Sequence, residues 1–245
     1  FVVTPTRRAN NMQRPDLSII ITAHREGIIS GATANSALSA ISHASKDSNL
    51  TCEVILVLDN ANLATSETLR HAFKNCHLKI IETQTADPGQ SRNAGISRAQ
   101  GYASAFLDGD DLWSSNWLSE GWKMLQSRPD CIGHSHCNMV FGDQKNLCWH
   151  VDSEGELFDP DYLLWANYWD ALSIAFTETY RNYPFKANDL ALGFGHEDWH
   201  WNAHTIAQGV AHKPVLNTVH FKRRRPNSVM ASVSKADGTV WPISK

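Results

Sequence analysis

Short hydrophobic runs of strand length alternate with helix-like segments over the first two thirds of the chain. In order, these runs and segments span residues 17–22, 30–45, 53–58, 66–74, 78–82, 89–100 and 102–107. Strands that alternate with helical segments are typical of βαβ units, in which parallel strands are covered by helices. We therefore expect an α/β fold: a single Rossmann-like domain with a mainly parallel central sheet flanked by helices.

From residue 112 the alternation weakens. Trp113, Trp117 and Trp122 are expected on one helix, and a polar stretch at 143–161 is expected to contain a hairpin or a loop. Three further strands are predicted at 131–141, 171–177 and 214–222, and a last helix is predicted at 196–207.

The composition narrows the function classes. A chain of 245 residues with 42% hydrophobic content can bury one sizeable core, and a formal net charge of −3 gives no general attraction to nucleic acid. Its hydrophobic runs are far shorter than the roughly 20 residues that cross a bilayer, and residues 1–15 lack the hydrophobic stretch of a signal peptide. Five cysteines without paired spacing favour a cytoplasmic location. A start at Phe1 is compatible with a piece of a longer chain that has further domains.

Acidic residues follow two of the predicted strands. Asp108-Gly109-Asp110-Asp111 places three carboxylates after the run at 102–107, and Asp59 ends the run at 53–58. Ligands of open α/β sheets bind beyond the carboxyl ends of the strands, so these groups should converge. Mg²⁺ or Mn²⁺ would relieve the repulsion within the turn and bind phosphate oxygens as well. The alternative is an acidic turn that caps the next helix.

The polar segment from Gly89 to Gly95 opens a helix just before that strand. Arg92 and Asn93 near its N-terminus could contact a phosphate or a carboxylate. Asp59 could accept hydrogen bonds from a base or a ribose, or could simply start a turn.

The segment from Gly193 to Trp201 is dense in ionisable and aromatic groups. In one interpretation a carboxylate at a helix start is a general base, and tryptophans line a sugar pocket. In a second, His196-Glu197-x-x-His200 is a zinc hydrolase motif with His204 as a third ligand. The glycines before His196 place it at the very start of the helix, which weighs against zinc. The third interpretation is an amphipathic helix with its tryptophans in the core.

One basic run, Lys222-Arg223-Arg224-Arg225, follows the last predicted strand. Arginine or lysine side chains can stabilise the charge of a departing phosphate, and His220 could complete a metal shell. The alternative is a solvated basic turn.

Four segments in this order resemble the inverting glycosyltransferases of family 2, which have the GT-A fold, over about residues 16–228. They are 17–24, 53–59, 89–111 and 195–199. The resemblance implies transfer of a sugar from a nucleotide diphosphate sugar to a hydroxyl of a glycan or lipid-linked acceptor, with Mn²⁺ or Mg²⁺, in polysaccharide biosynthesis. Two departures, at 23–25 and at Leu58-Asp59-Asn60, leave the donor nucleotide open, and uridine diphosphate is the usual default.

The same resemblance implies residue roles. The catalytic base would be Asp198, beside Glu197. The nucleotide sugar would be bound by Thr22, His24, Glu26, Asp59, Gln90, Arg92, Asn93, Asp108, Gly109, Arg223, Arg224 and Ser228. The metal would be held by Asp110, Asp108 and His220. The acceptor would contact Trp113, Trp199 and His196.

The expected organisation is an N-terminal extension (1–15), a nucleotide-sugar half (16–111), an acceptor and catalytic-base half (112–230) and a C-terminal tail (231–245). No nucleic-acid partner is expected, whereas a lipid-linked acceptor would bring the protein to the inner face of the membrane. Two alternative functions stay open at this point: a zinc-dependent hydrolase built on His196, Glu197 and His200, and a catalytically silent module that binds nucleotide sugars.

Overall fold

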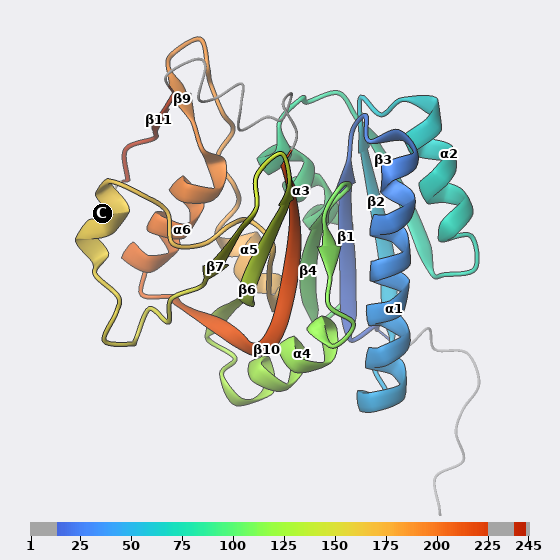
Figure 1. Cartoon of the computed structure of the whole chain (residues 1–245), viewed down its shortest axis with the longest axis horizontal. Helices are drawn as coiled ribbons and strands as arrows, with labels where there is room; N and C mark the ends of the chain where they lie inside the picture. The colour runs from blue at the N-terminus through green and yellow to red at the C-terminus, as the bar shows by residue number, and fades with distance from the viewer. Residues whose placement is uncertain (1–13, 225–237, 244–245) are drawn as a thin grey trace, which may run out of the picture.

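The computed structural model describes residues 14–224 and 238–243, and its centre is one large sheet (Figure 1). The strands lie in the order β3 (Leu78–Thr83), β2 (Cys52–Asp59), β1 (Leu17–Ala23), β4 (Ala103–Asp108), β8 (Ser173–Phe176), β6 (Cys131–Gly142), β10 (Ala211–Arg224) and β5 (Leu112–Trp113). Strands β3, β2, β1 and β4 are mutually parallel, whereas β8 runs antiparallel to both β4 and β6. The strands after residue 111 thus complete the sheet that the first half begins.

Six α-helices of the described residues surround this sheet. They are α1 (Ser30–Ser48), α2 (Leu63–Ala72), α3 (Pro88–Arg98), α4 (Trp117–Ser127), α5 (Thr177–Asn182) and α6 (Glu197–Ala207), with 3-10 turns η1 (Gly27–Ile29) and η2 (Pro160–Leu164). Helices α1 and α2 lie beside β1–β3, and α6 lies at the opposite end of the sheet (Figure 1). No helix of this described part is long and apolar enough to cross a membrane.

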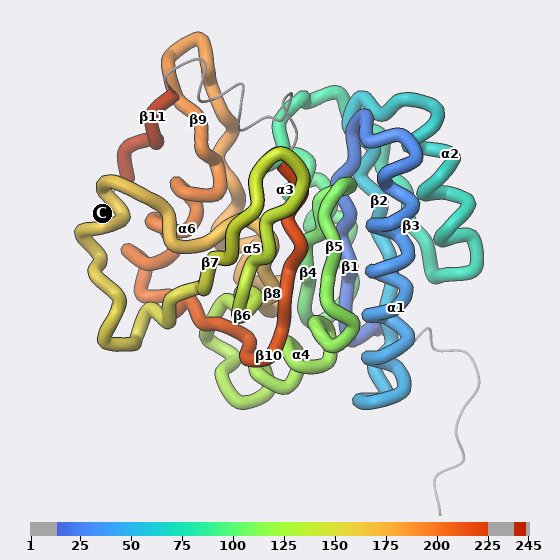
Figure 2. Tube along the Cα trace, viewed as in Figure 1, coloured from blue at the N-terminus to red at the C-terminus, as the bar shows by residue number. Residues whose placement is uncertain are grey.

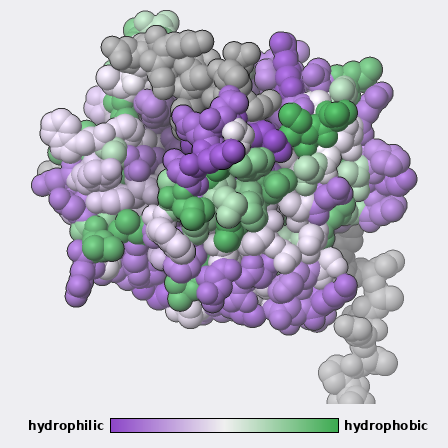
Figure 3. Space-filling view, in the orientation of Figure 1, coloured by the Kyte–Doolittle hydropathy of each residue, from purple (hydrophilic) through white to green (hydrophobic). Residues whose placement is uncertain are grey.

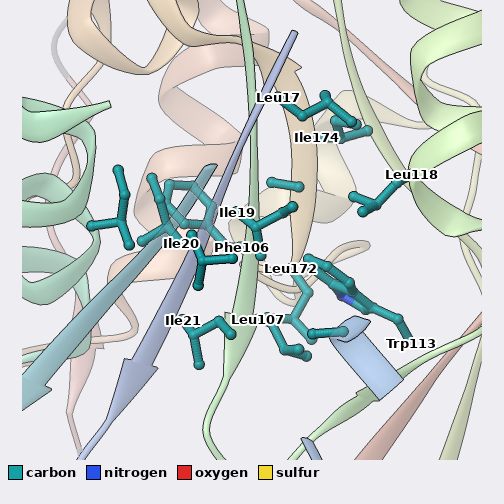
Figure 4. Close-up of a cluster of buried hydrophobic side chains, with 14 of the residues drawn as sticks. Leu17, Ile19, Ile20, Ile21, Phe106, Leu107, Trp113, Leu118, Leu172 and Ile174 are labelled. Atoms are coloured by element: carbon teal, nitrogen blue, oxygen red, sulfur yellow. The ribbon is translucent and has the colours of Figure 1, made fainter. Parts of the chain in front are cut away.

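The first strands have nearly continuous hydrophobic sequences because both of their faces are buried in the core. Ile19, Ile20 and Ile21 are all fully buried, because helices cover both faces of a parallel sheet. Figure 4 shows Ile19 among Leu118, Ile174 and Trp113, which come from later parts of the chain. The first and second halves therefore share one hydrophobic core.

Glycine at position 95 allows α3 to approach the sheet closely. A Cβ atom there would stand 2.4 Å from the side chain of Ile20 and 3.3 Å from that of Val57. The close approach fixes α3 against β1 and β2, and with it the polar side chains at the helix N-terminus.

Several element boundaries differ from the sequence expectation. Helix α2 begins at Leu63 rather than 66, because the Asn62 side chain accepts a hydrogen bond from Thr65 N and caps it. Trp113 lies in β5, and only the residues from Trp117 on are helical. The short helix α5 was missed altogether, within a stretch that was expected to be strand and loop.

The hairpin of β6 and β7 (Asn146–Trp149) explains the weak alternation after residue 130. All four residues of β7 are exposed, and among the described residues this edge strand pairs with β6 alone (Figure 2). Exposed hydrophobic side chains of this hairpin include Met139, Leu147 and Trp149, and hydrophobic residues gather near the middle of the face in Figure 3. A strand with one partner and no covering layer shows no clear hydrophobic alternation.

The last described residues return to the segment that precedes α6. Strand β11 (Thr239–Val240) pairs with β9 (Phe194–Gly195), and the Trp241 ring stacks on Phe194 at 3.9 Å between centroids. This pairing supports the loop that leads into α6.

Candidate active site

The acidic turn and Asp59 lie at the same edge of the sheet, as expected. Thr22 on β1 is in register with Asp108 on β4, and its Oγ1 donates to Asp108 Oδ1 at 2.9 Å. On the other side of β1, the strand β2 ends at Asp59. Gly109 N donates to the Thr22 carbonyl at 2.8 Å, which anchors the turn to the end of β1.

Asp59 and the residues after β1 form one polar corner of this edge. Asp59 is buried, and its Oδ1 accepts hydrogen bonds from Thr83 Oγ1 at 3.0 Å and Thr85 N at 2.7 Å. The His24 ring bonds to the Asp59 carbonyl, and His24 N donates to Glu26 Oε2 at 2.7 Å. Three of the expected nucleotide contacts therefore lie together, and their roles stay predictions.

Arg92 joins the acidic turn to α6. Its side chain is 3% exposed, with Nη2 bonded to both Asp108 oxygens at 2.9 and 3.2 Å and Nη1 to Glu197 Oε1 at 3.0 Å. Burial works to lower the pKa of Arg92, but the two carboxylates outweigh it and raise that pKa above its ordinary value. Of the two contacts that its position in the sequence suggested, with a phosphate or with a carboxylate, Arg92 makes the second, and its nucleotide contact stays a prediction.

Gln90 and Asn93 also bind protein rather than pointing to the rim. Gln90 Nε2 and Asn93 Nδ2 both donate to the Phe185 carbonyl, at 3.1 and 2.8 Å, and Phe185 N donates to Asn93 Oδ1 at 2.9 Å. They therefore fix the backbone at Phe185, and the nucleotide contacts expected of them do not fit this geometry.

Asp111, the last carboxylate of the turn, is buried and held by β10. Its Oδ1 accepts from Arg223 N at 2.7 Å, and its Oδ2 lies 2.6 Å from Lys222 Nζ. Lys222 Nζ is also 3.6 Å from Asp170 Oδ2 and 3.8 Å from Asp108 Oδ2. Two protein cations, Lys222 and Arg92, therefore neutralise part of the charge in the turn, but burial and the charges of Asp108 and Asp110 still raise the pKa of Asp111 to about 7. Relief of the remaining repulsion by a divalent cation stays a prediction.

The three expected metal ligands differ in position. Asp110 is partly exposed at the rim, and its carbonyl accepts a hydrogen bond from Arg223 Nε at 3.2 Å. Asp108 is occupied by Thr22 and Arg92. His220 is completely buried with its ring edge-on to Trp117, 4.3 Å between centroids. Neither of its ring nitrogens has a hydrogen-bond partner among the described residues, and its metal contact stays a prediction.

The two carboxylates at the start of α6 point to different surroundings. Glu197 is buried, and its oxygens accept from Arg92 and from Asn188 Nδ2 at 3.2 Å. Asp198 is partly exposed and accepts from Trp199 N at 2.7 Å. Burial, with the neighbouring Glu197 charge, raises the pKa of Asp198 to about 7. Of the pair, Asp198 is therefore suited to take a proton near neutral pH, whereas Glu197 holds Arg92.

The zinc interpretation finds no support in the described part of the chain, where no group of three or more His, Cys, Asp or Glu side chains could hold a metal ion. His196 precedes α6 with a left-handed φ of 59°, so it does not share a helical face with His200. His200 is buried, and its ring stacks on His204 at 5.9 Å.

The expected acceptor contacts are divided between the core and the rim. Trp113 is 3% exposed in the core beside Trp117, so it is not available to an acceptor. Trp199 is partly exposed, and its Nε1 donates to the Leu163 carbonyl at 2.8 Å. His196 lies next to it, 5.8 Å between ring centroids. Only these last two stay candidates.

The basic run is only partly described. Arg223 stacks its guanidinium over Phe141 at 4.5 Å and lies with Arg224 at the end of β10, both partly exposed. Ser228 lies outside the described residues. Sequence reasoning named Asp111 and Lys222 only as parts of the acidic cluster and the basic run, and it missed Asp170 as a member of the site. Lys222 belongs to the basic run that the sequence analysis assigned to a departing phosphate. The sequence around Asp170 contains no motif that would indicate a site.

Comparisons with known proteins agree with this architecture. The sequence pattern of the family described as Glycosyl transferase family 2 matches residues 18–185, which is more than half of the chain. A curated protein of Rickettsia bellii (strain RML369-C), described as an uncharacterized glycosyltransferase, is 27% identical over 95 residues, 39% of this chain and 14% of its own length.

Two solved structures share the fold. S. aureus TarS 1-349 in complex with UDP-GlcNAc is 16% identical, with a TM-score of 0.58 over 89% of this chain and 61% of that one. The mannosyltransferase PcManGT from Pyrobaculum calidifontis, in complex with GDP-Man and Mn²⁺, is also 16% identical, with a TM-score of 0.59 over 94% and 63%. The chain thus spans under two thirds of the length of these relatives. The expected α/β GT-A fold with a mainly parallel sheet is confirmed, and the chain belongs to glycosyl transferase family 2.

Proposed function

We propose that the protein is an inverting glycosyltransferase that moves a sugar from a nucleotide diphosphate sugar to an acceptor hydroxyl. The observation that supports it best is the Arg92 bridge, which joins the acidic turn at Asp108 to the start of α6, where Asp198 has a pKa of about 7. The bridge bonds to Glu197, the neighbour of Asp198, and so ties the turn that we assign to donor binding to the helix start that carries the proposed base.

The chemistry needs one proton transfer and one displacement. Asp198 takes the proton of the acceptor hydroxyl, and the acceptor oxygen attacks the anomeric carbon. The bond from that carbon to the diphosphate oxygen breaks, and the nucleoside diphosphate leaves with the bonding electrons. Attack opposite the leaving group inverts the anomeric configuration.

A divalent cation fits at the rim beside Asp110. Mg²⁺ in proteins is commonly held by one or two carboxylates together with substrate phosphates. Asp108 and Asp110 are both partly exposed, and Asp108 is already bonded to Thr22 and Arg92. When bound there, Mn²⁺ or Mg²⁺ would neutralise charge on the leaving diphosphate. PcManGT was solved with GDP-Man and Mn²⁺, which supports a metal of this kind without deciding between the two.

Replacing Asp110 by asparagine tests the metal assignment. Asparagine keeps the shape of the turn but removes the charge that attracts a hard cation. We expect Mn²⁺ to strengthen UDP or GDP binding by about tenfold or more in the wild type and hardly at all in Asp110→Asn. Isothermal titration with Mn²⁺ and with EDTA measures this, and equal Mn²⁺ enhancement in both proteins would refute the assignment.

Arg223 provides a test of the phosphate end of the site. Its partly exposed guanidinium lies beside the acidic turn. Loss of one charged hydrogen bond to phosphate costs about 1.5–3 kcal/mol, so Arg223→Ala should weaken nucleoside diphosphate binding by about tenfold or more. Nucleoside binding should change little. Equal losses for the nucleoside and its diphosphate would contradict the phosphate contact, and Arg224→Ala measures the share of the neighbouring residue.

The function as a whole is tested by a donor screen. Purified protein is incubated with UDP, GDP and dTDP sugars and Mn²⁺, and release of nucleoside diphosphate is measured with and without glycan acceptors. Relatives were solved with UDP-GlcNAc and with GDP-Man, so both belong in the screen. Binding without turnover of any donor would favour the silent binding module. The glycan or lipid-linked acceptor, polysaccharide biosynthesis, and a cytoplasmic location at the membrane face stay predictions.

A further inference from the structure

One tryptophan, Trp241, contacts both ends of the loop 186–195 that precedes α6. Its ring stacks on Phe194 with 3.9 Å between centroids and an angle of 13° between the ring planes. The Lys186 ammonium lies 3.9 Å from the centroid of the same Trp241 ring, and Trp241 Nε1 donates to the Ala187 carbonyl at 2.9 Å. A single side chain therefore ties the two ends of the loop together. The proposed transfer reaction assigns it no role.

Backbone hydrogen bonds hold the same loop. Strand β11 pairs in parallel with β9, and Thr239 N donates to the Gly193 carbonyl at 2.8 Å. Within the loop, the backbone N–H groups of Asp189 and Phe194 donate to each other's carbonyl, at 2.8 Å each. Leu192 near the tip of the loop is 67% exposed, so hydrophobic burial contributes little there. The contacts at its two ends therefore fix the loop.

The loop leads directly into the residues that carry the proposed base. Asn188 donates from its backbone N to Asp87 Oδ2 at 2.7 Å and from Nδ2 to Glu197 Oε2 at 3.2 Å. His196, the residue after β9, has a left-handed backbone with a φ of 59° and a ψ of 56°. That conformation is unfavourable for a residue with a Cβ atom and persists only where the surroundings hold it. The direction of the first turn of α6, and of Asp198 on it, therefore depends on how β9 is held.

We propose that Trp241 is a positioning residue for the catalytic base: with Thr239 it forms a clasp on the loop 186–195 and so fixes the direction in which Asp198 points. This inference rests on the proposed function. A general base must lie within hydrogen-bond reach of the acceptor hydroxyl, and a misplacement of about 1 Å can cost about 10²-fold in rate. Loss of the clasp should therefore lower turnover.

Donor binding should be independent of the clasp. The side chains of Thr22 and Asp59 at the edge of the sheet are held by hydrogen bonds with Asp108, Thr83 and Thr85. These bonds belong to the ends of β1 to β4 and not to the loop before α6. A clasp variant should therefore bind a nucleoside diphosphate as the wild type does.

Hydrogen exchange measured by mass spectrometry tests the clasp without any turnover. We expect amides at 186–198 to exchange at least about tenfold faster in Trp241→Ala than in the wild type, because the ends of the loop are no longer tied. Exchange in β1 should not change, which shows that the sheet stays folded. Thr239→Pro removes the N–H that binds Gly193 and should have the same effect with the tryptophan intact. Unchanged exchange at 186–198 in the folded variants would overturn the proposal.

Kinetics separate positioning from a purely structural role. With the donor found in the screen, Trp241→Ala should lower kcat by about tenfold or more, while the Kd for UDP or GDP with Mn²⁺ stays within about twofold. Trp241→Phe keeps a ring that can stack on Phe194, so it should recover most of kcat. Equal losses of kcat and of nucleotide affinity in Trp241→Ala would refute the positioning role.

The pH profile provides a second readout that a purely structural role would not change. Burial and the Glu197 charge raise the pKa of Asp198 to about 7, and Arg92 and Asp170 are the other charged groups that act on it. An Asp198 released from the clasp is better hydrated, so its pKa should fall toward its ordinary value. The rise of kcat/KM should then move to lower pH in Trp241→Ala. A slower variant with the wild-type profile would contradict the proposal.

Trp149 on β7 offers a matched control. It is 63% exposed and contacts the ring of His136, with 4.9 Å between centroids. Trp149→Ala removes the same side chain away from the loop, so exchange at 186–198 and kcat should stay at wild-type values. Changes equal to those of Trp241→Ala would refute the clasp. If the wild type neither binds a nucleoside diphosphate nor turns over any donor, the proposed function fails. An active wild type whose exchange and kcat are unaffected by Trp241→Ala overturns the clasp alone.

Discussion

Arg92→Met is expected to destabilise the protein by about 3–5 kcal/mol, the range for breaking a buried ion pair by removing one partner. Arg92 is 3% exposed and neutralises the side chains of Asp108 and Glu197, which are 27% and 10% exposed. Methionine fills a similar volume but leaves both carboxylates without a cation. Unfolding in urea, followed by circular dichroism, measures the loss.

Two controls separate this effect from a general loss of charge. Arg92→Lys keeps the charge but cannot reach both carboxylates with a planar fork, so it should recover only part of the stability. Arg70→Met removes an exposed ion pair with Glu82, 2.6 Å apart, with side chains 41% and 74% exposed. That variant should lose no more than about 1 kcal/mol. A loss for Arg92→Met as small as that for Arg70→Met would show that the bridge is not structurally important.

The fold could be predicted because the hydrophobic pattern of each strand is contained within a few consecutive residues. The isoleucines of β1 are buried on both faces by helices, so the strand is hydrophobic at nearly every position. The ends of helices were predicted less accurately because one capping side chain can shift where a helix begins, as Asn62 does for α2. Helix α5 has only six residues, too few to show a helical period.

The sequence predicted where the site residues lie but not which partners they bond to. Acidic residues at strand ends and at the start of α6 mark the edge where ligands bind, and the structure places them there. What each residue bonds to depends on partners far away in the sequence. Arg92 and Glu197 are 105 positions apart, and Asn93 and Phe185 are 92 apart. The contacts that Arg92 and Asn93 make within the protein therefore could not be predicted from their own segment. The sequence around Lys222, a run of basic residues, gave no sign that this side chain is buried.

The pH dependence of turnover should follow the carboxyl of Asp198. A general base acts only when deprotonated, and burial together with Glu197 raises the pKa of Asp198 to about 7. The value of kcat/KM should therefore rise with pH through about 7 and level off above it, since this ratio reports the free enzyme. A profile that is flat between about pH 5 and 8 would contradict this role, because an ordinary aspartate is already ionised there.

Asp198→Asn should lower kcat by about 10²-fold or more, the usual contribution of a general base, while donor affinity is unchanged. Successive helical residues point in directions about 100° apart, so Glu197 contacts Arg92 while Asp198 stays partly exposed.

The zinc alternative predicts the opposite pattern of kcat losses, since Glu197 would be the base and His200 a metal ligand. His200→Ala should leave kcat within about tenfold of wild type, because His200 is a buried helix residue with no reacting partner. Glu197→Gln should reduce unfolding free energy as well as turnover, because it weakens the Arg92 bridge. Comparing kcat with the urea midpoint across the three variants therefore decides the base. A stable Asp198→Asn with near-normal kcat would exclude Asp198, whereas loss of kcat without loss of stability is the signature of the group that takes the proton.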